Sequence, residues 1–249
     1  MKVIQVRDFN DLGKKAADII ANCVKRNPKA VLGLATGSTP KTTYKELIRD
    51  HIEKGTSYRQ IRTVNLDEYV GLPKNNPNSY HYFMREELFN SIDLLEENIH
   101  IPNGSAPNIY DECKAYDGLI ESMGGVDLQI LGIGRNGHIG FNEPGTSFEE
   151  TTHVVDLTLD TRKANARFFN NLEEVPTQAI TMGIKNILQS KTILLLASGR
   201  EKAEAMAHLL NTNNVTSAFP ASSLHQHDHV TVIADEDALS LVYRLERRA

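Results

Sequence analysis

The sequence predicts an α/β protein with a Rossmann-like, mostly parallel sheet and helices on both faces. Two observations lead to this fold class. Short apolar segments typical of buried strands alternate with longer segments of helical periodicity, which indicates repeated strand–helix units. The chain of 249 residues also contains no internal repeat and no linker rich in Pro, Gly or Ser. We therefore expect a single domain over residues 1–249.

Seven segments have the short apolar character of buried strands. In chain order they are residues 3–6, 30–35, 61–66, 98–101, 126–131, 192–197 and 230–234. The segment 192–197 illustrates the pattern, because it contains three leucines and an isoleucine. An eighth segment, His153–Asp156, is also strand-like.

The segments between these strands place apolar residues at helical spacing. In residues 8–25, Leu12, Ala16, Ile19 and Cys23 follow the helical period and predict a helix. The next helix is expected over residues 40–52, where Pro40 suits the first turn because its missing N–H has no partner to lose there. Further helices are expected at residues 79–89, 109–123 and 201–210, with a last helix that reaches the C-terminus.

Composition excludes several classes of protein. A net charge of −5 argues against a general binder of nucleic acid or of anionic membranes, although one small basic pocket remains possible. The two cysteines, Cys23 and Cys113, are too few for a disulfide framework, so we expect a cytoplasmic protein. No apolar stretch predicts a signal peptide or a transmembrane helix.

Ligands of such sheets bind outside the carboxyl ends of the strands. The first loop at such a position contains Thr36, Gly37, Ser38 and Thr39, directly before the helix that Pro40 opens. Hydroxyl groups and free N–H groups at a helix start can hold a phosphate. The residue order is not that of a Walker A loop, so ATP is not implied. A capped helix without a ligand explains this loop equally well.

The second loop begins with Asp67 and Glu68, where the strand 61–66 ends. A carboxylate at this position is well placed for general acid–base catalysis. Taken alone, however, an acidic pair is more commonly a solvated turn.

The third loop, Gly132–Gly145 (GIGRNGHIGFNEPG), begins with the G-x-G-x-x-G fingerprint of dinucleotide-binding proteins. That fingerprint requires a helix after its third glycine. Here two more glycines and a proline follow within eight residues, so we expect no helix and no NAD site. The glycines instead indicate an irregular loop whose backbone comes close to a small ligand.

The same loop carries Asn136, His138 and Glu143. We expect these side chains to form an orienting chain, in which a carboxylate fixes one imidazole nitrogen while the other nitrogen exchanges protons with a substrate. A different cluster, the three histidines within residues 225–229, raises the possibility of a metal site. A surface loop is the preferred interpretation of that cluster, because no other ligand group supports a metal.

The three loops together resemble the glucosamine-6-phosphate deaminase family. The matching segments run from residue 34 to 169 and read LATGSTPKTTYKEL, TVNLDEYVGL, NPNSYHYFM, GIGRNGHIGFNEPG and DTRKANARFF. The related 6-phosphogluconolactonases share the fold but lack the pairing of LDEYVGL with GHIGFNEPG. The resemblance implies a Rossmann-like sheet, conversion of glucosamine 6-phosphate to fructose 6-phosphate and ammonia, and no metal or organic cofactor.

The resemblance also implies roles for individual residues. His138, oriented by Glu143, would open the sugar ring, and Asp67 would move a proton between C2 and C1. The loop Thr36–Thr39, together with Arg167 and Lys202, would bind the phosphate.

Two departures from the family pattern bear on function. Some members have aspartate at the position of Asn136, which cannot add negative charge beside the histidine. Residues 148–159 contain no Lys or Arg, whereas members activated by N-acetylglucosamine 6-phosphate have basic residues there. We therefore expect hyperbolic kinetics in a monomer or small homo-oligomer. The alternatives are a lactonase on the same fold and a non-catalytic sugar-phosphate sensor, which would normally bring a helix-turn-helix domain.

Overall fold

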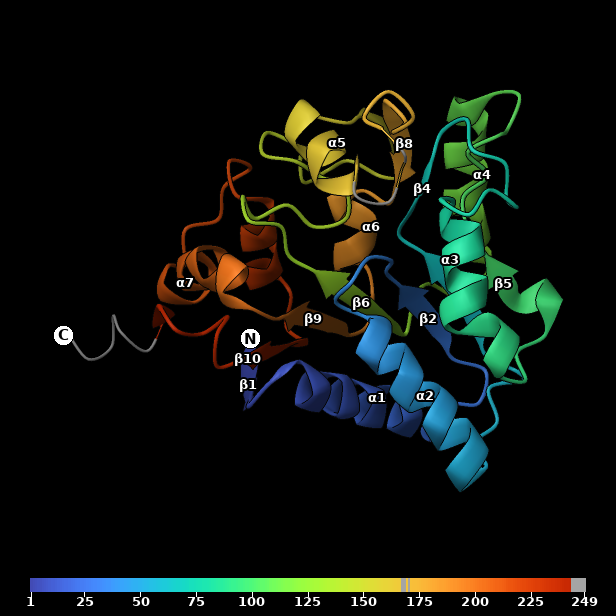
Figure 1. Cartoon of the computed structure of the whole chain (residues 1–249), viewed down its shortest axis with the longest axis horizontal. Coiled ribbons are helices and arrows are strands. Elements are labelled where there is room, and N and C mark those ends of the chain that lie inside the picture. The colour runs from blue at the N-terminus through green and yellow to red at the C-terminus, as the bar shows by residue number, and fades with distance from the viewer. Residues whose placement is uncertain (167–168, 170, 243–249) are drawn as a thin grey trace.

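The computed structural model describes residues 1–166, 169 and 171–242. Its centre is a seven-stranded sheet in the order β1-β10-β9-β6-β2-β3-β5, in which every neighbouring pair is parallel (Figure 1). The strands are β1 (Lys2–Val6), β2 (Val31–Leu34), β3 (Arg62–Asn65), β5 (Ile99–His100), β6 (Leu128–Gly132), β9 (Ile193–Ala197) and β10 (Val230–Asp235). All seven segments expected as strands belong to this sheet, and the expected fold class is confirmed.

Helices cover the sheet on both faces, with α1 and α2 below it in the view of Figure 1 and α6 above it. The described helices are α1 (Phe9–Arg26), α2 (Lys41–Lys54), α3 (Tyr80–Glu87), α4 (Ile109–Ser122), α5 (Leu159–Asn165), α6 (Ile184–Leu188) and α7 (Ala203–Asn211). Short 3₁₀ helices span Phe89–Ser91, Glu96–Asn98, Arg200–Lys202 and Pro220–Gln226. None of the helices in the described part of the chain is long and apolar enough to cross a membrane.

Local sequence explains where the helices begin. Asp8 caps α1, because its carboxylate accepts hydrogen bonds from the backbone N–H groups of Asn10 and Asp11. Pro40 lies directly before α2. Its nitrogen carries no hydrogen, and no hydrogen bond is lost because an N–H group at a helix start has no partner within the helix. The helix expected at 201–210 begins as a 3₁₀ turn, so α7 starts only at Ala203. The expected C-terminal helix falls mainly on residues 243–249, outside the described residues.

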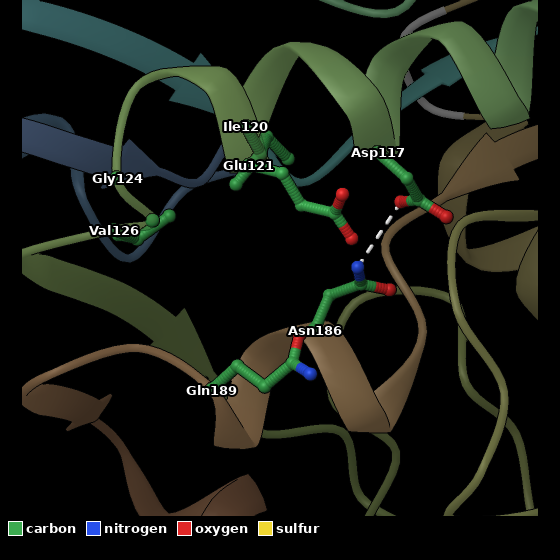
Figure 2. A pocket seen from close by; sticks show the side chains of 8 residues that line it. Asp117, Ile120, Glu121, Gly124, Val126, Asn186 and Gln189 are labelled. Atoms are coloured by element: carbon green, nitrogen blue, oxygen red, sulfur yellow. Dashed lines mark hydrogen bonds between the residues drawn. The ribbon is translucent and has the colours of Figure 1, made fainter.

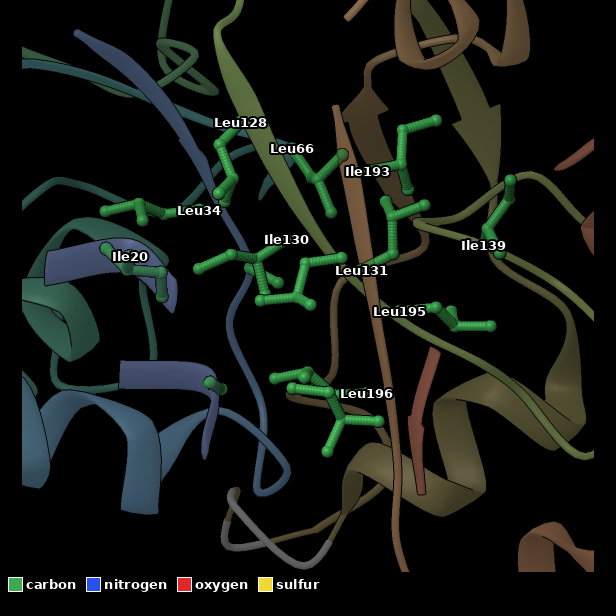
Figure 3. Close-up of a cluster of buried hydrophobic side chains, with 14 of the residues drawn as sticks. Ile20, Leu34, Leu66, Leu128, Ile130, Leu131, Ile139, Ile193, Leu195 and Leu196 are labelled. Atoms are coloured by element: carbon green, nitrogen blue, oxygen red, sulfur yellow. The ribbon is translucent and has the colours of Figure 1, made fainter. Parts of the chain in front are cut away.

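The core lies between the large sheet and its helices. All five residues of β9 are buried, and they pack with apolar residues of β2, β6 and α1 such as Leu34, Ile130 and Ile20 (Figure 3). Burial on both faces is what a parallel sheet covered by helices requires. This packing fixes the strand ends, from which the loops of the site emerge.

A second, three-stranded antiparallel sheet was not expected from the sequence. It consists of β4 (Asp67–Tyr69), β8 (Gln178–Thr181) and β7 (His153–Asp156), in the order β4-β8-β7. Leu66 joins the two sheets, since its N–H donates to Leu34 of β2 and its carbonyl accepts from Met182, just after β8. Asp67 therefore starts a strand and does not lie in the solvated turn considered above.

Candidate active site

The loops singled out in the sequence meet where the strand order reverses. From β2 the chain continues to β3 and β5 on one side, whereas β6 lies on its other side. In parallel sheets the carboxyl ends of such neighbouring strands form a crevice for ligands. Thr36 and His138 lie in the loops after β2 and β6, and Asp67 begins β4 one residue after the end of β3.

Asp67 is a buried carboxyl group without a hydrogen-bond donor among the described residues. Only 8% of the surface of Asp67 is exposed to solvent. Burial, with a smaller contribution from the negative charge of Glu68, raises the pKa of Asp67 to about 8. A carboxyl group in this environment is poised to exchange a proton near neutral pH.

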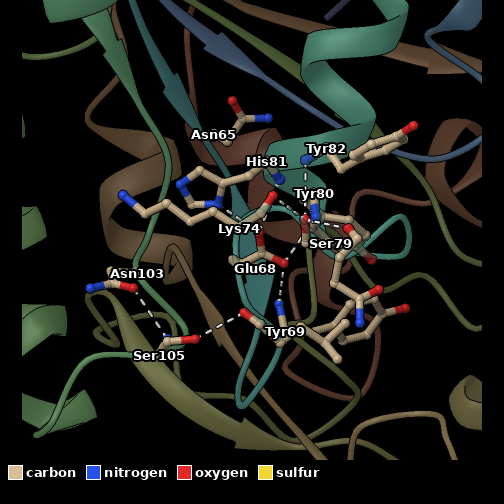
Figure 4. Close-up of polar contacts among 12 residues, drawn as sticks. Asn65, Glu68, Tyr69, Lys74, Ser79, Tyr80, His81, Tyr82, Asn103 and Ser105 are labelled. Atoms are coloured by element: carbon tan, nitrogen blue, oxygen red, sulfur yellow. Dashed lines mark hydrogen bonds and ion pairs between the residues drawn. The ribbon is translucent and has the colours of Figure 1, made fainter.

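Glu68, the other member of the acidic pair, has a different environment. Its carboxylate accepts hydrogen bonds from the backbone N–H groups of Tyr69, Tyr80 and His81 and contacts His81 Nδ1 at 2.8 Å (Figure 4). Two of these N–H groups belong to the first turn of α3, where negative charge is favourable. Glu68 thus holds α3 against β4, and Asp67 is the member of the pair left for chemistry.

Phenols from three helices lie near enough to Asp67 to be affected by its charge, a feature that was not anticipated from the sequence. They are Tyr44 of α2, Tyr80 of α3 and Tyr116 of α4. Burial is the main cause that raises the pKa of each phenol, and the charge of Asp67 raises each one further. Tyr80 lies within NPNSYHYFM, a segment noted above without a role for this residue. The raised pKa of each phenol keeps it un-ionised near neutral pH, so none of the three adds a charge near Asp67.

The loop after β6 contains a hydrogen-bonded chain of three side chains. His138 Nδ1 lies 2.8 Å from Asn136 Oδ1, and Asn136 Nδ2 donates to Glu143 Oε2 at 2.7 Å. The second oxygen of Glu143 accepts from Thr161 of α5 at 2.7 Å. Because Asn136 Oδ1 can only accept, His138 carries a hydrogen on Nδ1 and leaves Nε2 for a ligand.

The charge in this chain resides on Glu143. Burial alone would raise the pKa of its carboxyl group, but hydrogen bonds and charge from His138, Thr161 and Asn136 lower it to about 2. His138 is therefore linked to a permanent carboxylate through Asn136. Glu143 Oε2 also lies 3.5 Å from His138 Nδ1, within ion-pair distance, so the carboxylate acts on the imidazole directly as well as through Asn136.

The glycines of this loop allow close approach of side chains from the same chain, and no helix follows them. The expected approach of a small ligand stays a prediction. A Cβ on Gly134 would lie 2.3 Å from the His138 ring, and one on Gly137 would lie 2.2 Å from Phe219. Gly137 also has a φ of +82°, in the region that favours glycine. The fingerprint glycines thus make room for two aromatic rings, and the NAD interpretation remains excluded by the missing helix.

Two contacts hold the loop in place. Phe141 N donates to the Thr181 hydroxyl at 3.1 Å, and Thr181 is the register partner of Asp67 in the second sheet. On the other side, the Gly137 carbonyl accepts from the backbone N–H of Ala221 in the 3₁₀ helix Pro220–Gln226. The loop that carries His138 is therefore fixed relative to the strand that carries Asp67.

Of the residues expected to bind phosphate, those that the structure describes follow the carboxyl ends of β2 and β9. Residues 36–39 form the loop between β2 and α2, with Gly37 at a φ of +96°, and the Tyr80 hydroxyl interacts with the Thr36 side chain. Lys202 ends the 3₁₀ turn after β9, and its side chain is only 18% exposed. Arg167 lies outside the described residues.

A pocket of about 300 Å³ lies away from this edge, at the opposite, amino end of β6. It is lined by residues such as Asp117, Glu121 and Asn186 (Figure 2).

The histidines of residues 225–229 also lie away from this edge. The ring nitrogens of His225 and His227 contact the backbone carbonyls of Leu209 and Ser190, respectively. Within the described residues, no group of three His, Cys, Asp or Glu side chains could hold a metal.

Fold and site together define a Rossmann-like α/β protein with a buried carboxyl group and a hydrogen-bonded histidine at the carboxyl edge of its sheet. The chain belongs to the family of glucosamine-6-phosphate isomerases and 6-phosphogluconolactonases, whose sequence model matches residues 8–233. This result agrees with the resemblance inferred from the motifs.

Individual relatives narrow the comparison within this family. A glucosamine-6-phosphate deaminase of Geobacillus sp. (strain WCH70) is 59% identical over 97% of this chain and 96% of its own. Glucosamine-6-phosphate deaminase 1 of Bacillus subtilis (strain 168) is 53% identical over 97% and 99%.

Solved structures give the same order of similarity. A monomeric glucosamine-6-phosphate deaminase superposes with a TM-score of 0.95 at 53% identity, covering 97% of this chain and 100% of that chain. A 6-phosphogluconolactonase from Thermotoga maritima shares the fold, with a TM-score of 0.73 at 22% identity over 94% and 98%.

Proposed function

We propose that this protein is a glucosamine-6-phosphate deaminase, which converts glucosamine 6-phosphate to fructose 6-phosphate and ammonia. Relatives of this name are 50% to 59% identical over nearly the whole chain. The structural observation that carries the proposal is the placement of two proton-transfer groups, Asp67 and His138, at one edge of the sheet. Aldose–ketose isomerisation of a cyclic sugar needs two such groups, one at the ring oxygen and one over C1 and C2.

His138 acts on the ring. Its Nε2 takes the proton of the C1 hydroxyl and delivers a proton to the ring oxygen, which opens the sugar. The Asn136–Glu143 chain orients the imidazole and stabilises it when it is protonated. Such a positioned acid–base group contributes about 10²- to 10⁴-fold in rate.

Asp67 acts on the open chain. One carboxylate can take the proton from C2 and return it to C1, because the two carbons are adjacent on one face of a cis-enolamine. The resulting iminium is hydrolysed at C2, which breaks the C–N bond and releases ammonia. No cofactor is required for these proton transfers.

The phosphate is bound by the residues at the start of α2 and by cations. Thr36, Gly37, Ser38 and Thr39 supply hydroxyl and backbone N–H groups at the positive end of the α2 dipole. Lys202 and Arg167 supply charge, which a protein of net charge −5 must concentrate locally to hold an anion.

We further propose a cytoplasmic protein that acts as a monomer or small homo-oligomer. The solved deaminase that superposes on this chain with a TM-score of 0.95 is monomeric, which supports the proposal. Neither nucleic acid nor a membrane is a proposed partner.

The experiment is an assay for ammonia and fructose 6-phosphate from purified protein and glucosamine 6-phosphate, with Asp67→Asn as the inactive control. Stoichiometric formation of both products is expected. A sensor would release no ammonia. A lactonase would hydrolyse 6-phosphogluconolactone and would not exchange the C2 hydrogen of glucosamine 6-phosphate with solvent.

A further inference from the structure

The Asp67 carboxyl group lacks the partners that its acidic neighbours have. Glu68 accepts from three backbone N–H groups, and Glu143 accepts from Asn136 and Thr161. For Asp67, the structure gives neither a hydrogen-bond donor nor a cation among the described residues. A buried carboxyl group in this situation stays protonated, because ionisation would leave a charge without a partner.

The groups that the structure gives around Asp67 are neutral or negative. Its own strand contributes Glu68 and the phenol of Tyr69, and three helices contribute the phenols of Tyr44, Tyr80 and Tyr116. Its register partner in β8 is Thr181, whose hydroxyl donates to the Met182 carbonyl. The backbone of the His138 loop lies beside it, since a Cβ on Gly140 would be 3.9 Å from Asp67 Oδ2. The described part of the site thus offers nothing that turns this acid into the base that the reaction needs.

The substrate itself carries the missing charge. Proton abstraction occurs at C2, and the nitrogen of an amino sugar is bonded to that carbon. A carboxylate that can reach the C2 proton therefore lies close to the amine, which is an ammonium group at neutral pH. An opposite charge at such a distance favours the ionised form of a carboxyl group.

We infer that the substrate's ammonium group is the counter-ion that ionises Asp67, so that the base forms only when a 2-amino sugar phosphate occupies the site. This inference rests on the proposed function and makes Asp67 a determinant of substrate specificity as well as the base. Sugar phosphates with a hydroxyl or an acetamido group at C2 leave Asp67 protonated. They can bind through their phosphate, but they are not isomerised.

The proton balance is closed at each step. When the ammonium form binds, Asp67 releases one proton to solvent. The carboxylate then takes the C2 proton, the electron pair of the C2–H bond forms the C1–C2 double bond, and the aldehyde oxygen takes a proton from the ammonium group. Asp67 returns its proton to C1, which gives the iminium that water hydrolyses to fructose 6-phosphate and an ammonium ion. When the ammonium ion leaves, Asp67 takes back one proton from solvent.

The test compares two open-chain probes that differ only at C2. They are 2-amino-2-deoxyglucitol 6-phosphate and glucitol 6-phosphate, which carry the same phosphate. Calorimetry at pH 7 in buffers of different ionisation enthalpy measures the protons released on binding. Infrared difference spectra follow the C=O band of the protonated Asp67, identified by its absence in Asp67→Asn.

We expect the amine probe to release about one proton more than the hydroxyl probe and to abolish the carboxylic acid band, whereas glucitol 6-phosphate leaves the band intact. The amine probe should bind the wild type at least about tenfold more tightly than glucitol 6-phosphate. That preference should largely disappear in Asp67→Asn. In His138→Gln it should persist, because His138 acts at the ring oxygen.

Equal proton release by the two probes, or a carboxylic acid band that survives the amine probe, would overturn the inference. Both readouts are obtained with the wild type, so they do not depend on the folding of a variant. The ammonia assay separates this result from the proposed function. An enzyme that releases ammonia but fails the probe comparison is a deaminase whose base is ionised in another way.

Discussion

Asn136 Oδ1 lies 2.8 Å from His138 Nδ1, which is closer than the 3.5 Å between that nitrogen and the Glu143 carboxylate. The neutral amide thus makes the shorter contact with the imidazole, and the carboxylate makes the longer one. An amide in this position orients the ring as a carboxylate would, but it adds no negative charge at the shorter distance. The charge at this position should therefore tune the ring-opening step.

Asn136→Asp tests this relation. A carboxylate in contact with the imidazole favours the protonated ring, so the limb of the pH profile that reports His138 should move to higher pH by about one unit. The measurement is kcat/KM for glucosamine 6-phosphate between pH 5 and 9. Asn213→Asp makes the same change of charge at an exposed position and serves as the control. An unchanged profile in Asn136→Asp would contradict the role given to Asn136.

Gly134→Ala tests whether the loop glycines serve the histidine. The new Cβ would lie 2.3 Å from the His138 ring, so the ring must move out of its hydrogen-bonded position. We expect kcat/KM to fall by at least about 10²-fold, the usual contribution of an acid–base group. Gly118→Ala is the matched control, because a Cβ there meets no atom within 4 Å in the helix α4. That control should keep full activity, and comparable losses in both variants would count against the interpretation.

The stability of the protein should depend on Asp67 in a defined pH window. The pKa of Asp67 is raised to about 8 in the folded state, so the folded state binds more protons than the unfolded state between about pH 4 and 8. The contribution of this group to the free energy of unfolding is full below about pH 4 and is lost as the pH rises towards 8.

Asp67→Asn should consequently be more stable than the wild type at pH 9 by at least about 1.4 kcal/mol, the equivalent of one pKa unit. The difference should shrink towards pH 4, as urea unfolding at several pH values can show. Glu143→Gln is the control of opposite sign, because the pKa of Glu143 is lowered to about 2 and its charge stabilises the folded state at neutral pH. A stability difference for Asp67→Asn that does not change with pH would contradict the burial argument.

Saturation with substrate should be hyperbolic and insensitive to N-acetylglucosamine 6-phosphate. Residues 148–159 offer Glu149, Glu150 and Asp156 but no Lys or Arg. Lys185 reaches this segment from α6, but its ammonium pairs with Glu149 at 3.0 Å. An effector phosphate would therefore meet uncompensated negative charge. The measurement is the initial rate at low substrate concentration with and without the effector, and we expect the two rates to be equal. A sigmoidal curve that the effector makes hyperbolic would show that cations outside this segment form a regulatory site.

The large sheet could be predicted from the sequence because most of its strands are apolar, and β2 and β9 within it are buried at every residue. All seven expected segments are strands of this sheet. The loop with the dinucleotide fingerprint could also be distinguished from an NAD site, because the required helix does not follow it. The small sheet was not foreseen, because β4 is three residues long and follows β3 after the single residue Leu66. Its pairing with β8 joins residues more than a hundred positions apart, and no local pattern encodes that contact.

In the candidate site, too, contacts within one loop could be predicted from the sequence, whereas contacts between distant segments could not. Asn136, His138 and Glu143 lie within eight residues of one another, so their hydrogen-bonded chain could be anticipated from a single loop. The phenols around Asp67 come from three separate helices, and Thr161 reaches Glu143 from a fourth. Tertiary packing brings these groups together, and a buried tyrosine in a helix has no sequence pattern that distinguishes a site from a core.

The most direct test of the whole account is hydrogen exchange at C2 of glucosamine 6-phosphate in deuterated water, followed by NMR for the wild type and Asp67→Asn. The wild type should exchange the C2 hydrogen and release ammonia. Asp67→Asn should bind glucitol 6-phosphate normally and yet lose C2 exchange by at least about 10²-fold, because the buried amide cannot accept the proton. C2 exchange near the wild-type rate in a folded Asp67→Asn protein would contradict the assignment of Asp67 as the base.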